Sequence, residues 1–214
     1  MTCNHCCGAE KLFDLKGAKK ELKKFNKKGA GKATKKLISH LLKNDLQEKS
    51  LLDIGGGIGA IQWTFLRNSG RCTIDVDASL GYLTVAKGYA KEHGYEQSTE
   101  FLHGDFVDQY DEVANADYVT LDKVICCYPD YKSLLNHAMR KCNFTLILVY
   151  PLGGFIPKAI AQFNKIYFYL KKNPFRTYIH SPKEVEQFIC NHGFKLVTKS
   201  ISFPWHVQTY ERIS

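Results

Sequence analysis

The sequence lacks any apolar run long enough to cross a bilayer. Its longest apolar stretch, residues 144–157, is broken by two glycines and stays short of the roughly 20 apolar residues that a spanning helix needs. The first residues, Met1 to His5, lack the apolar core of a secretory signal. We therefore expect a cytoplasmic protein whose eight cysteines are mostly reduced.

The cysteines also lack the spacing of a structural zinc site. Cys3-Asn4-His5-Cys6 resembles half of such a site, but no second pair of this kind follows, so we expect no bound metal. Cys126-Cys127 is expected either to pack a loop or to supply a nucleophile beside the reacting group. If Cys6-Cys7 folds over Cys126-Cys127, a thiol, metalloid or metal substrate becomes an alternative.

Acidic residues are scarce in one part of the chain. Residues 11–43 carry 12 lysines against Asp14 and Glu21, whereas the remainder has 18 basic and 19 acidic residues. We expect residues 1–33 to form a lysine-rich helical extension or lid, which either caps a cofactor site or binds an anionic substrate, RNA or an acidic membrane. The apolar positions that fall near helical spacing in this segment are Leu12, Phe13, Leu15, Leu22 and Phe25.

A glycine turn is the most informative feature that the sequence does contain. The short apolar run Leu51–Ile54 leads into Gly55-Gly56-Gly57-Ile58-Gly59 and a helix start. Glycines allow positive φ and a close approach of backbone to a ligand, and the start of a helix offers unpaired N–H groups. The turn fits both the dinucleotide pattern and the S-adenosylmethionine (SAM) pattern. Asp53 favours SAM, because a carboxylate suits an ammonium and a sulfonium but repels a pyrophosphate.

Acidic residues also follow later predicted strands. Asp77 ends the predicted strand Cys72–Asp77, 22 residues after Gly55, as expected for a carboxylate that reaches ribose hydroxyls. A strand near Thr99–Leu102 leads to Asp105, which can accept a hydrogen bond from an adenine amino group. The predicted cofactor-binding residues are Asp53, Gly55, Gly56, Gly57, Gly59, Asp77, Ala78, Gly104, Asp105, Phe106 and Leu121.

Further runs complete a predicted sheet. Phe144–Tyr150 is continuously apolar, as expected of a central strand covered on both faces. We predict an α/β fold, Rossmann-like and doubly wound, with a seven-stranded, mostly parallel sheet that ends in a C-terminal antiparallel hairpin and carries the basic helical extension in front. The catalytic domain then spans residues 34–214, with a substrate-covering insertion at 152–180. The other predicted strands are Asp117–Leu121, Lys195–Phe203 and Trp205–Arg212, and the other predicted helices include Lys35–Leu42, Lys158–Lys172 and Ser181–His192.

From about residue 30 onward the chain resembles the class I SAM-dependent methyltransferases. This resemblance implies SAM as the cofactor and methyl transfer as the activity. The segments CCGAEKLF, LLDIGGGIGAIQ and LDKVICCYPD also resemble bacterial proteins labelled magnesium-protoporphyrin O-methyltransferases. The residues that match the class I motifs are Asp53, Gly55, Gly57 and Gly59 in the first motif, Asp77 at the ribose position, and Gly104-Asp105 on the adenine side.

Polar residues beyond the fourth predicted strand are the candidates for contact with the acceptor. We predict catalytic roles for Asp122, Tyr128 and His180, although Asp122 can instead bind the cofactor and His180 can instead cap the following helix. The aromatic stripe of the predicted helix Lys158–Lys172 is typical of a core-facing helix. Alternatively, it lines a pocket for a flat acceptor whose carboxylate pairs with Lys158 or Arg176.

The sequence therefore predicts an enzyme that methylates a small molecule, for example at a carboxylate or thiol. The alternative is an RNA methyltransferase that uses the basic extension, although Tyr128-Pro129-Asp130 departs from the Asn/Asp-Pro-Pro-Tyr/Phe signature of base-nitrogen methylation. An NAD-dependent oxidoreductase and a noncatalytic SAM-binding scaffold are further hypotheses. The sequence leaves the acceptor atom and the oligomeric state open.

Overall fold

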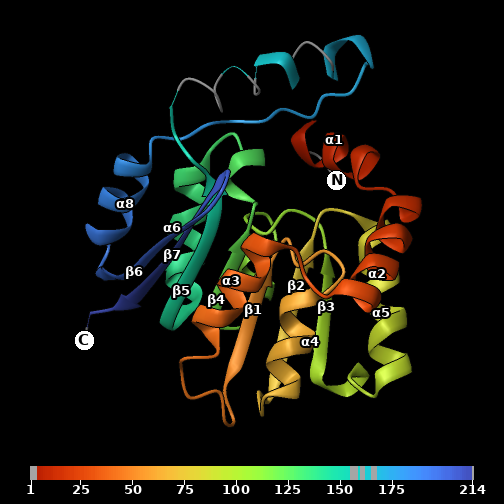
Figure 1. The fold of residues 1–214 in the computed structure, drawn as a ribbon, viewed down its shortest axis with the longest axis vertical. Helices are drawn as coiled ribbons and strands as arrows, with labels where there is room; N and C mark the ends of the chain where they lie inside the picture. Colours follow the sequence, from red (N-terminus) through yellow and green to blue (C-terminus); the bar gives the residue numbers. More distant parts are fainter. Residues whose placement is uncertain (1–3, 155–158, 160–161, 165–167, 214) are drawn as a thin grey trace.

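A seven-stranded sheet with the order β3-β2-β1-β4-β5-β7-β6 forms the centre of the molecule (Figure 1). The structure is a computed structural model that describes residues 4–154, 159, 162–164 and 168–213. Strands β1 to β5 pair in parallel, and β7 runs antiparallel to both β5 and β6. This confirms the predicted sheet and its terminal hairpin. The strands are β1 (Ser50–Ile54), β2 (Cys72–Asp77), β3 (Thr99–His103), β4 (Ala116–Asp122), β5 (Cys142–Pro151), β6 (Phe194–Ser202) and β7 (Trp205–Arg212).

Helices cover both faces of this sheet, which explains why successive apolar residues occur in its inner strands β1 and β5. Leu52 and Ile54 of β1 join the core under α6 (Tyr131–Lys141) and α8 (Pro182–Cys190). Leu51 joins the opposite core with α3 (Lys32–Leu41) and α4 (Ala60–Arg67). Because successive side chains of a strand point to opposite faces, consecutive apolar residues serve both cores. The packing of Trp63 of α4 against Tyr89 extends the second core to α5 (Leu80–His93).

Two helices, α1 (Asn4–Leu12) and α2 (Leu15–Lys28), precede α3. The break between them falls at Asp14, whose carboxylate caps α2 by accepting a hydrogen bond from the Gly17 N–H. α2 buries Ala18 against α5 and leaves its lysines exposed. α3 begins at Lys32, earlier than the predicted Lys35, because Gly31 is extended and serves as its N-cap. No helix in the described part of the chain is long and apolar enough to span a bilayer.

The described residues between β5 and α8 form a strap that passes over the carboxyl ends of the strands and above α1 (Figure 1). Part of the predicted helix Lys158–Lys172, including Ile160, Ile166 and Tyr167, lies outside the described residues. Of its other members, Phe163 is 73% and Leu170 is 74% exposed. The expected core-facing stripe is therefore wrong at these two positions, because the strap lies over the end of the sheet and turns this side toward solvent.

Candidate active site

A cavity of about 870 Å³ lies at the carboxyl ends of the strands, under α1 and the strap. Its floor includes the glycine turn after β1 and residues that end or follow β2 and β4. In an open parallel sheet, ligands bind where the strand order reverses, which here is between β1 and β4. The volume is near the upper end of the range for small-molecule sites, so the cavity can hold more than one small ligand.

The glycine turn gives this floor its shape. Gly55 and Gly57 both line the cavity, with φ values of +69° and +63° that favour glycine. A Cβ on Gly55 would also lie only 2.6 Å from Val124 Cγ2. Gly56 lines the cavity as well, whereas Gly59 caps α4 and is packed against the Trp63 indole. The predicted cofactor residues of the turn therefore divide into three that face the cavity and one that supports them.

Asp77, at the end of β2, lines the cavity together with the neighbouring Ala78. Asp77 Oδ2 accepts a hydrogen bond from the Gly57 N–H at 2.9 Å, and Oδ1 accepts one from the Ser79 N–H at 2.7 Å. Burial raises the pKa of Asp77, and these two hydrogen bonds oppose that rise. Because each carboxylate oxygen has a second lone pair, Asp77 can still accept hydrogen bonds from ligand hydroxyls.

Asp53 lies beneath the glycine turn and does not line the cavity. Its side chain is fully buried and accepts hydrogen bonds from Thr120 Oγ1 at 2.6 Å and from Gln62 Nε2 at 3.5 Å. Burial raises the pKa of Asp53 to about 7, and burial likewise raises that of its neighbour Asp75. This placement favours support of the turn over the predicted contact with a cofactor ammonium. Leu121 is also fully buried and does not line the cavity.

Gly104, Asp105 and Phe106, which follow β3, all line the cavity. Tyr128 donates its hydroxyl hydrogen to Asp105, with distances of 2.9 and 3.0 Å to the two carboxylate oxygens. Asp105 also accepts a hydrogen bond from the Val107 N–H at 2.9 Å. Cys6 Sγ lies 3.4 Å from Asp105 Oδ2, but Cys6 is in a disulfide and has no proton to donate, so at this residue the expectation of reduced cysteines is wrong. Burial, and then the charge of Asp105, raise the pKa of Tyr128. Tyr128 is therefore a hydrogen-bond donor here, and Asp105 is the acceptor of the pair.

Asp122 ends β4 and belongs to a charged cluster in the cavity wall. Its carboxylate accepts hydrogen bonds from Thr34 Oγ1 at 2.6 Å and from Lys123 Nζ at 2.9 Å. Lys123 Nζ also contacts Thr34 Oγ1 at 3.0 Å and lies 5.7 Å from the centre of the Trp205 ring. All four residues line the cavity. Lys123 has a φ of +66°, which is uncommon for a residue with a side chain and is concentrated at functional sites.

The cysteines of the two adjacent pairs do not all reach the cavity. Cys6, Cys126 and Cys127 line it, but Cys7 does not. Cys126 Sγ and Cys127 Sγ are 3.7 Å apart, and Cys126 Sγ donates to the Lys123 carbonyl at 3.1 Å. The hydrogen bond with Cys127, followed by burial, raises the pKa of the Cys126 thiol, which makes it a poor nucleophile. The described residues contain no cluster of three or more potential metal ligands.

His180 does not line the cavity. Its Nε2 lies 2.8 Å from the Ile125 carbonyl, so Nε2 carries the proton, and its ring packs 4.0 Å from the Tyr131 ring. Burial lowers the pKa of His180. The adjacent bond from the Tyr178 N–H to the Cys126 carbonyl is 2.7 Å long. These contacts favour a role for His180 in fixing the strap to the loop after β4 over the predicted role as a base.

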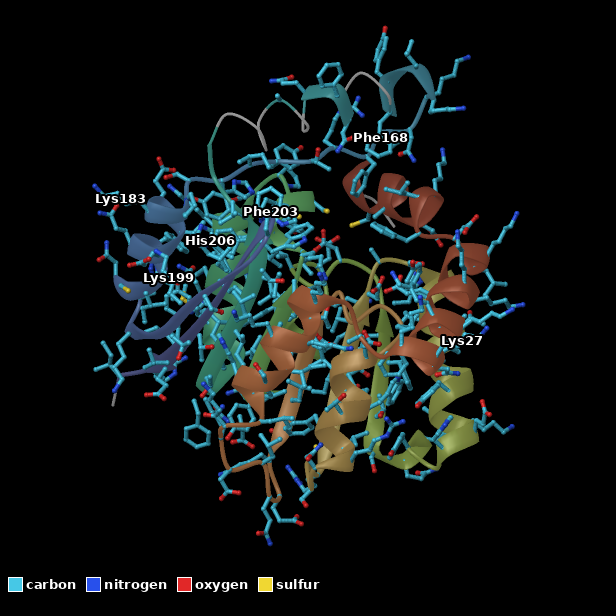
Figure 2. All side chains as sticks on the ribbon, viewed as in Figure 1. Lys27, Phe168, Lys183, Lys199, Phe203 and His206 are labelled. Carbon is cyan, nitrogen blue, oxygen red and sulfur yellow. The ribbon has the colours of Figure 1, made fainter. Side chains whose placement is uncertain are left out.

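The sequence predicts a lid at residues 1–33 and a covering insertion at residues 152–180, but not the ring contacts that join these two segments into a roof. Phe13 packs edge-on against Phe175 with ring centres 5.8 Å apart, and Phe168 packs against Phe175 at 5.2 Å. Phe168 projects from the strap toward α1 (Figure 2). Gly8 allows this approach, because a Cβ there would lie 2.4 Å from the Phe175 nitrogen. No local pattern could reveal the roof, since it joins segments more than 150 residues apart.

The fold and the site define an α/β protein that binds a nucleotide-like cofactor at the switch point of its sheet. Residues 19–127 match the sequence model of the methyltransferase small domain family. This match spans just over half of the chain, and the chain belongs to this family. It is therefore an enzyme, a methyltransferase, and SAM is its cofactor, as the sequence analysis predicted.

Solved structures with the same fold include several methyltransferases. Magnesium protoporphyrin IX methyltransferase from Synechocystis PCC 6803 with bound SAH superposes with a TM-score of 0.68 at 15% identity, over 84% of this chain and 81% of that one. An O-methyltransferase family 2 protein from Planctomyces limnophilus, in complex with apigenin, superposes with a TM-score of 0.62 at 22% identity, over 79% of this chain and 51% of that one. A putative RNA methyltransferase from Pyrococcus horikoshii superposes with a TM-score of 0.61 at 13% identity, over 85% of this chain and 84% of that one. No curated protein matches the sequence.

Proposed function

We propose that this methyltransferase acts on a small, largely apolar acceptor bound beneath the roof formed by α1 and the strap. The observation that carries this proposal is the single cavity that runs from the acidic residues at the ends of β2 and β4 to the aromatic cluster of Phe13, Phe168 and Phe175. The acidic end suits a polar cofactor and the aromatic end suits an apolar second ligand. Residues 152–180 would then act as the substrate-covering insertion.

The cavity residues fit the adenosine part of SAM. Gly55 and Gly57 present backbone without side chains, and Asp77 is held with oxygens that can accept bonds from ribose hydroxyls. Asp105 and Phe106 lie on the neighbouring β3 side, where a carboxylate and a ring suit adenine. Because β3 and β2 would hold adenosine, the amino-acid end of the cofactor would lie toward β1 and β4.

The cluster at the end of β4 suits that amino-acid end. Asp122 can face an ammonium, and Lys123 with Thr34 can face a carboxylate, so a zwitterion would meet one partner for each of its charges. S-Adenosylhomocysteine carries this amino-acid group and 5′-methylthioadenosine lacks it. We expect Lys123→Met to weaken binding of the former by about tenfold or more and to leave the latter unchanged. Equal effects on both ligands in calorimetry would contradict this role.

Bound SAM supplies a methyl group that its sulfonium already activates toward displacement. The residues of this chain then have to align the acceptor, exclude water and receive any released proton. Alignment is the largest of these effects and can contribute on the order of 7–11 kcal/mol. The aromatic roof excludes water. The Tyr128 hydroxyl, which donates its hydrogen to Asp105, can still accept a hydrogen bond from an acceptor hydroxyl and so orient it.

A small ring-containing acceptor suits this roof better than a nucleic acid does. Two of the similar structures are a magnesium protoporphyrin methyltransferase and a complex with apigenin, and this supports a flat acceptor. RNA is the second candidate, because the lysines of α2 border the cavity through Lys20 and Lys24 and a putative RNA methyltransferase shares the fold.

The test is to measure formation of S-adenosylhomocysteine from SAM with a panel of flat aromatic acceptors that carry hydroxyl, carboxyl or thiol groups, and separately with total RNA. We expect turnover with at least one small acceptor and a loss of that turnover in Phe175→Ala, which opens the roof. Asp111→Ala, an exposed change outside the cavity lining, serves as the control. Turnover with RNA alone would contradict the proposal.

A further inference from the structure

The outer side of the roof exposes an unusual number of apolar side chains. Phe163, Tyr169 and Leu170 of the strap are 73–74% exposed, and Leu12 and Leu15 at the junction of α1 and α2 are 38% and 40% exposed. The strap lies directly above α1 (Figure 1), and the rings of Phe13 and Phe175 join the two segments from below. Exposed apolar side chains on neighbouring segments are typical of an interaction surface, and Leu12 also lines the cavity.

Lysines flank these apolar residues on both segments. Lys11 and Lys16 border the junction of α1 and α2, and Lys171 and Lys172 follow Leu170 directly; all four are exposed. Among the described residues none of the four forms an ion pair within 4 Å. The remaining lysines of α2 extend the positive charge from this corner along one side of the molecule, where Lys27 marks the far end (Figure 2).

The chemistry of this surface favours an anionic lipid bilayer over RNA. Leu12, Leu15 and Leu170 gain free energy when they leave water for the boundary of the acyl chains, and they offer no ring for a nucleobase to stack on. The rings of Phe163 and Tyr169 suit either partner, so the aliphatic side chains carry this distinction. The cations are lysines without arginine, and lysine supplies a point charge and not the two-pronged contact that arginine makes with phosphate. Arg176 of the strap donates instead to the carbonyls of Asn173 and Phe175.

We infer that this outer roof docks on the surface of an anionic membrane, with its apolar side chains at the acyl boundary and its lysines at the headgroups. Docking in this way would place the cavity mouth against the bilayer, since Leu12 and Phe13 both line the cavity and are more than one third exposed. The inference goes beyond the methyltransferase activity and does not depend on the identity of the acceptor.

Vesicle cosedimentation tests this docking. We expect the protein to bind vesicles of phosphatidylcholine mixed with phosphatidylglycerol and not vesicles of phosphatidylcholine alone. Each lysine near an anionic surface is worth about a fivefold change in the binding constant. The combined change of Lys11, Lys16, Lys171 and Lys172 to Gln should therefore weaken binding by about 600-fold when the four contributions add. Changing Phe163, Tyr169 and Leu170 to Ser should weaken it by about tenfold or more.

Matched variants separate this surface from charge and hydrophobicity in general. The control for charge changes four exposed lysines elsewhere to Gln: Lys43, Lys91, Lys132 and Lys183. Lys183 lies on α8, across the molecule from Lys27 (Figure 2). The control for apolar side chains changes Val197, Ile201 and Ile213 to Ser. Every variant must first bind S-adenosylhomocysteine like the wild type, because none of these residues lines the cavity.

The results then decide the inference. Loss of vesicle binding in both outer-roof variants, with both controls intact, would support it. Three results would overturn it: no binding to anionic vesicles, full binding by the variant without the apolar side chains, or equal losses in the control variants. Wild-type binding to RNA without binding to vesicles would likewise overturn it and show a polyanion site in its place.

Discussion

Replacing Asp77 by alanine removes the carboxylate that we assign to the ribose of the cofactor. In the protein this carboxylate is held from below by the N–H groups of Gly57 and Ser79. It lies at the end of β2, in the cavity wall, and its remaining lone pairs are its only means of contact with a ligand hydroxyl. The substitution therefore removes ligand contacts while the backbone of the turn keeps its glycines.

The magnitude follows from the number of hydrogen bonds. A bond to a charged group contributes roughly 1.5–3 kcal/mol, so the loss of two ribose bonds predicts at least a 100-fold weaker affinity for S-adenosylhomocysteine. The effect on stability is smaller. Two backbone N–H groups lose their acceptor, at a cost of about 1–3 kcal/mol, but the protein no longer has to bury a carboxylate whose pKa burial raises.

Titration calorimetry with S-adenosylhomocysteine measures the affinity, and urea unfolding measures the stability of the same sample. Asp108→Ala is the control, because it removes the same charge from an exposed residue that does not line the cavity. An unchanged affinity in Asp77→Ala, with normal folding, would refute the assignment of Asp77 to the ribose. A similar loss in Asp108→Ala would show a general effect of charge in its place.

Three further predictions concern the floor and wall of the cavity. The pKa of Asp53 is raised from 3.8 to about 7, so between these values the folded protein keeps a proton that the unfolded chain releases. The free energy of unfolding therefore falls as the pH rises from about 4 to 7. Urea unfolding of Asp53→Asn should show a smaller fall over this range than the wild type, and equal falls would contradict this. Gly57→Ala should weaken S-adenosylhomocysteine binding by about tenfold, because its φ of +63° costs a residue with a side chain about 1–2 kcal/mol; calorimetry showing unchanged binding would count against the turn as the cofactor floor. Tyr128→Phe should lower kcat by about tenfold or more with cofactor affinity preserved, and an unchanged kcat would remove Tyr128 from the reaction.

The sheet was predictable because its signals are local. The runs that became β1 and β5 contain successive apolar residues, as strands covered on both faces require, and the run that became β2 alternates apolar and polar residues. The glycines and Asp77 could be placed at one edge of the sheet, because the carboxyl ends of parallel strands meet there. These predictions needed no knowledge of which distant segments pack together.

The rest of the site depends on contacts between distant segments. Nothing near Thr34 in the sequence indicates that its hydroxyl bonds to Asp122, and nothing near Phe13 indicates Phe175 as its partner. Asp53 matches a cofactor motif, yet the structure buries it beneath the turn that it precedes. His180 is close to a helix start in sequence, but its contact with the Ile125 carbonyl arises only when the strap folds back over the sheet.

The central claim is that the acidic residues at the ends of these strands bind an adenosyl amino acid and not a dinucleotide. Parallel calorimetric titrations of the full chain with S-adenosylhomocysteine and with NAD test this claim most directly. We predict saturable heat with S-adenosylhomocysteine and none with NAD. Tight binding of NAD, with no heat from S-adenosylhomocysteine on well-folded protein, would contradict the account.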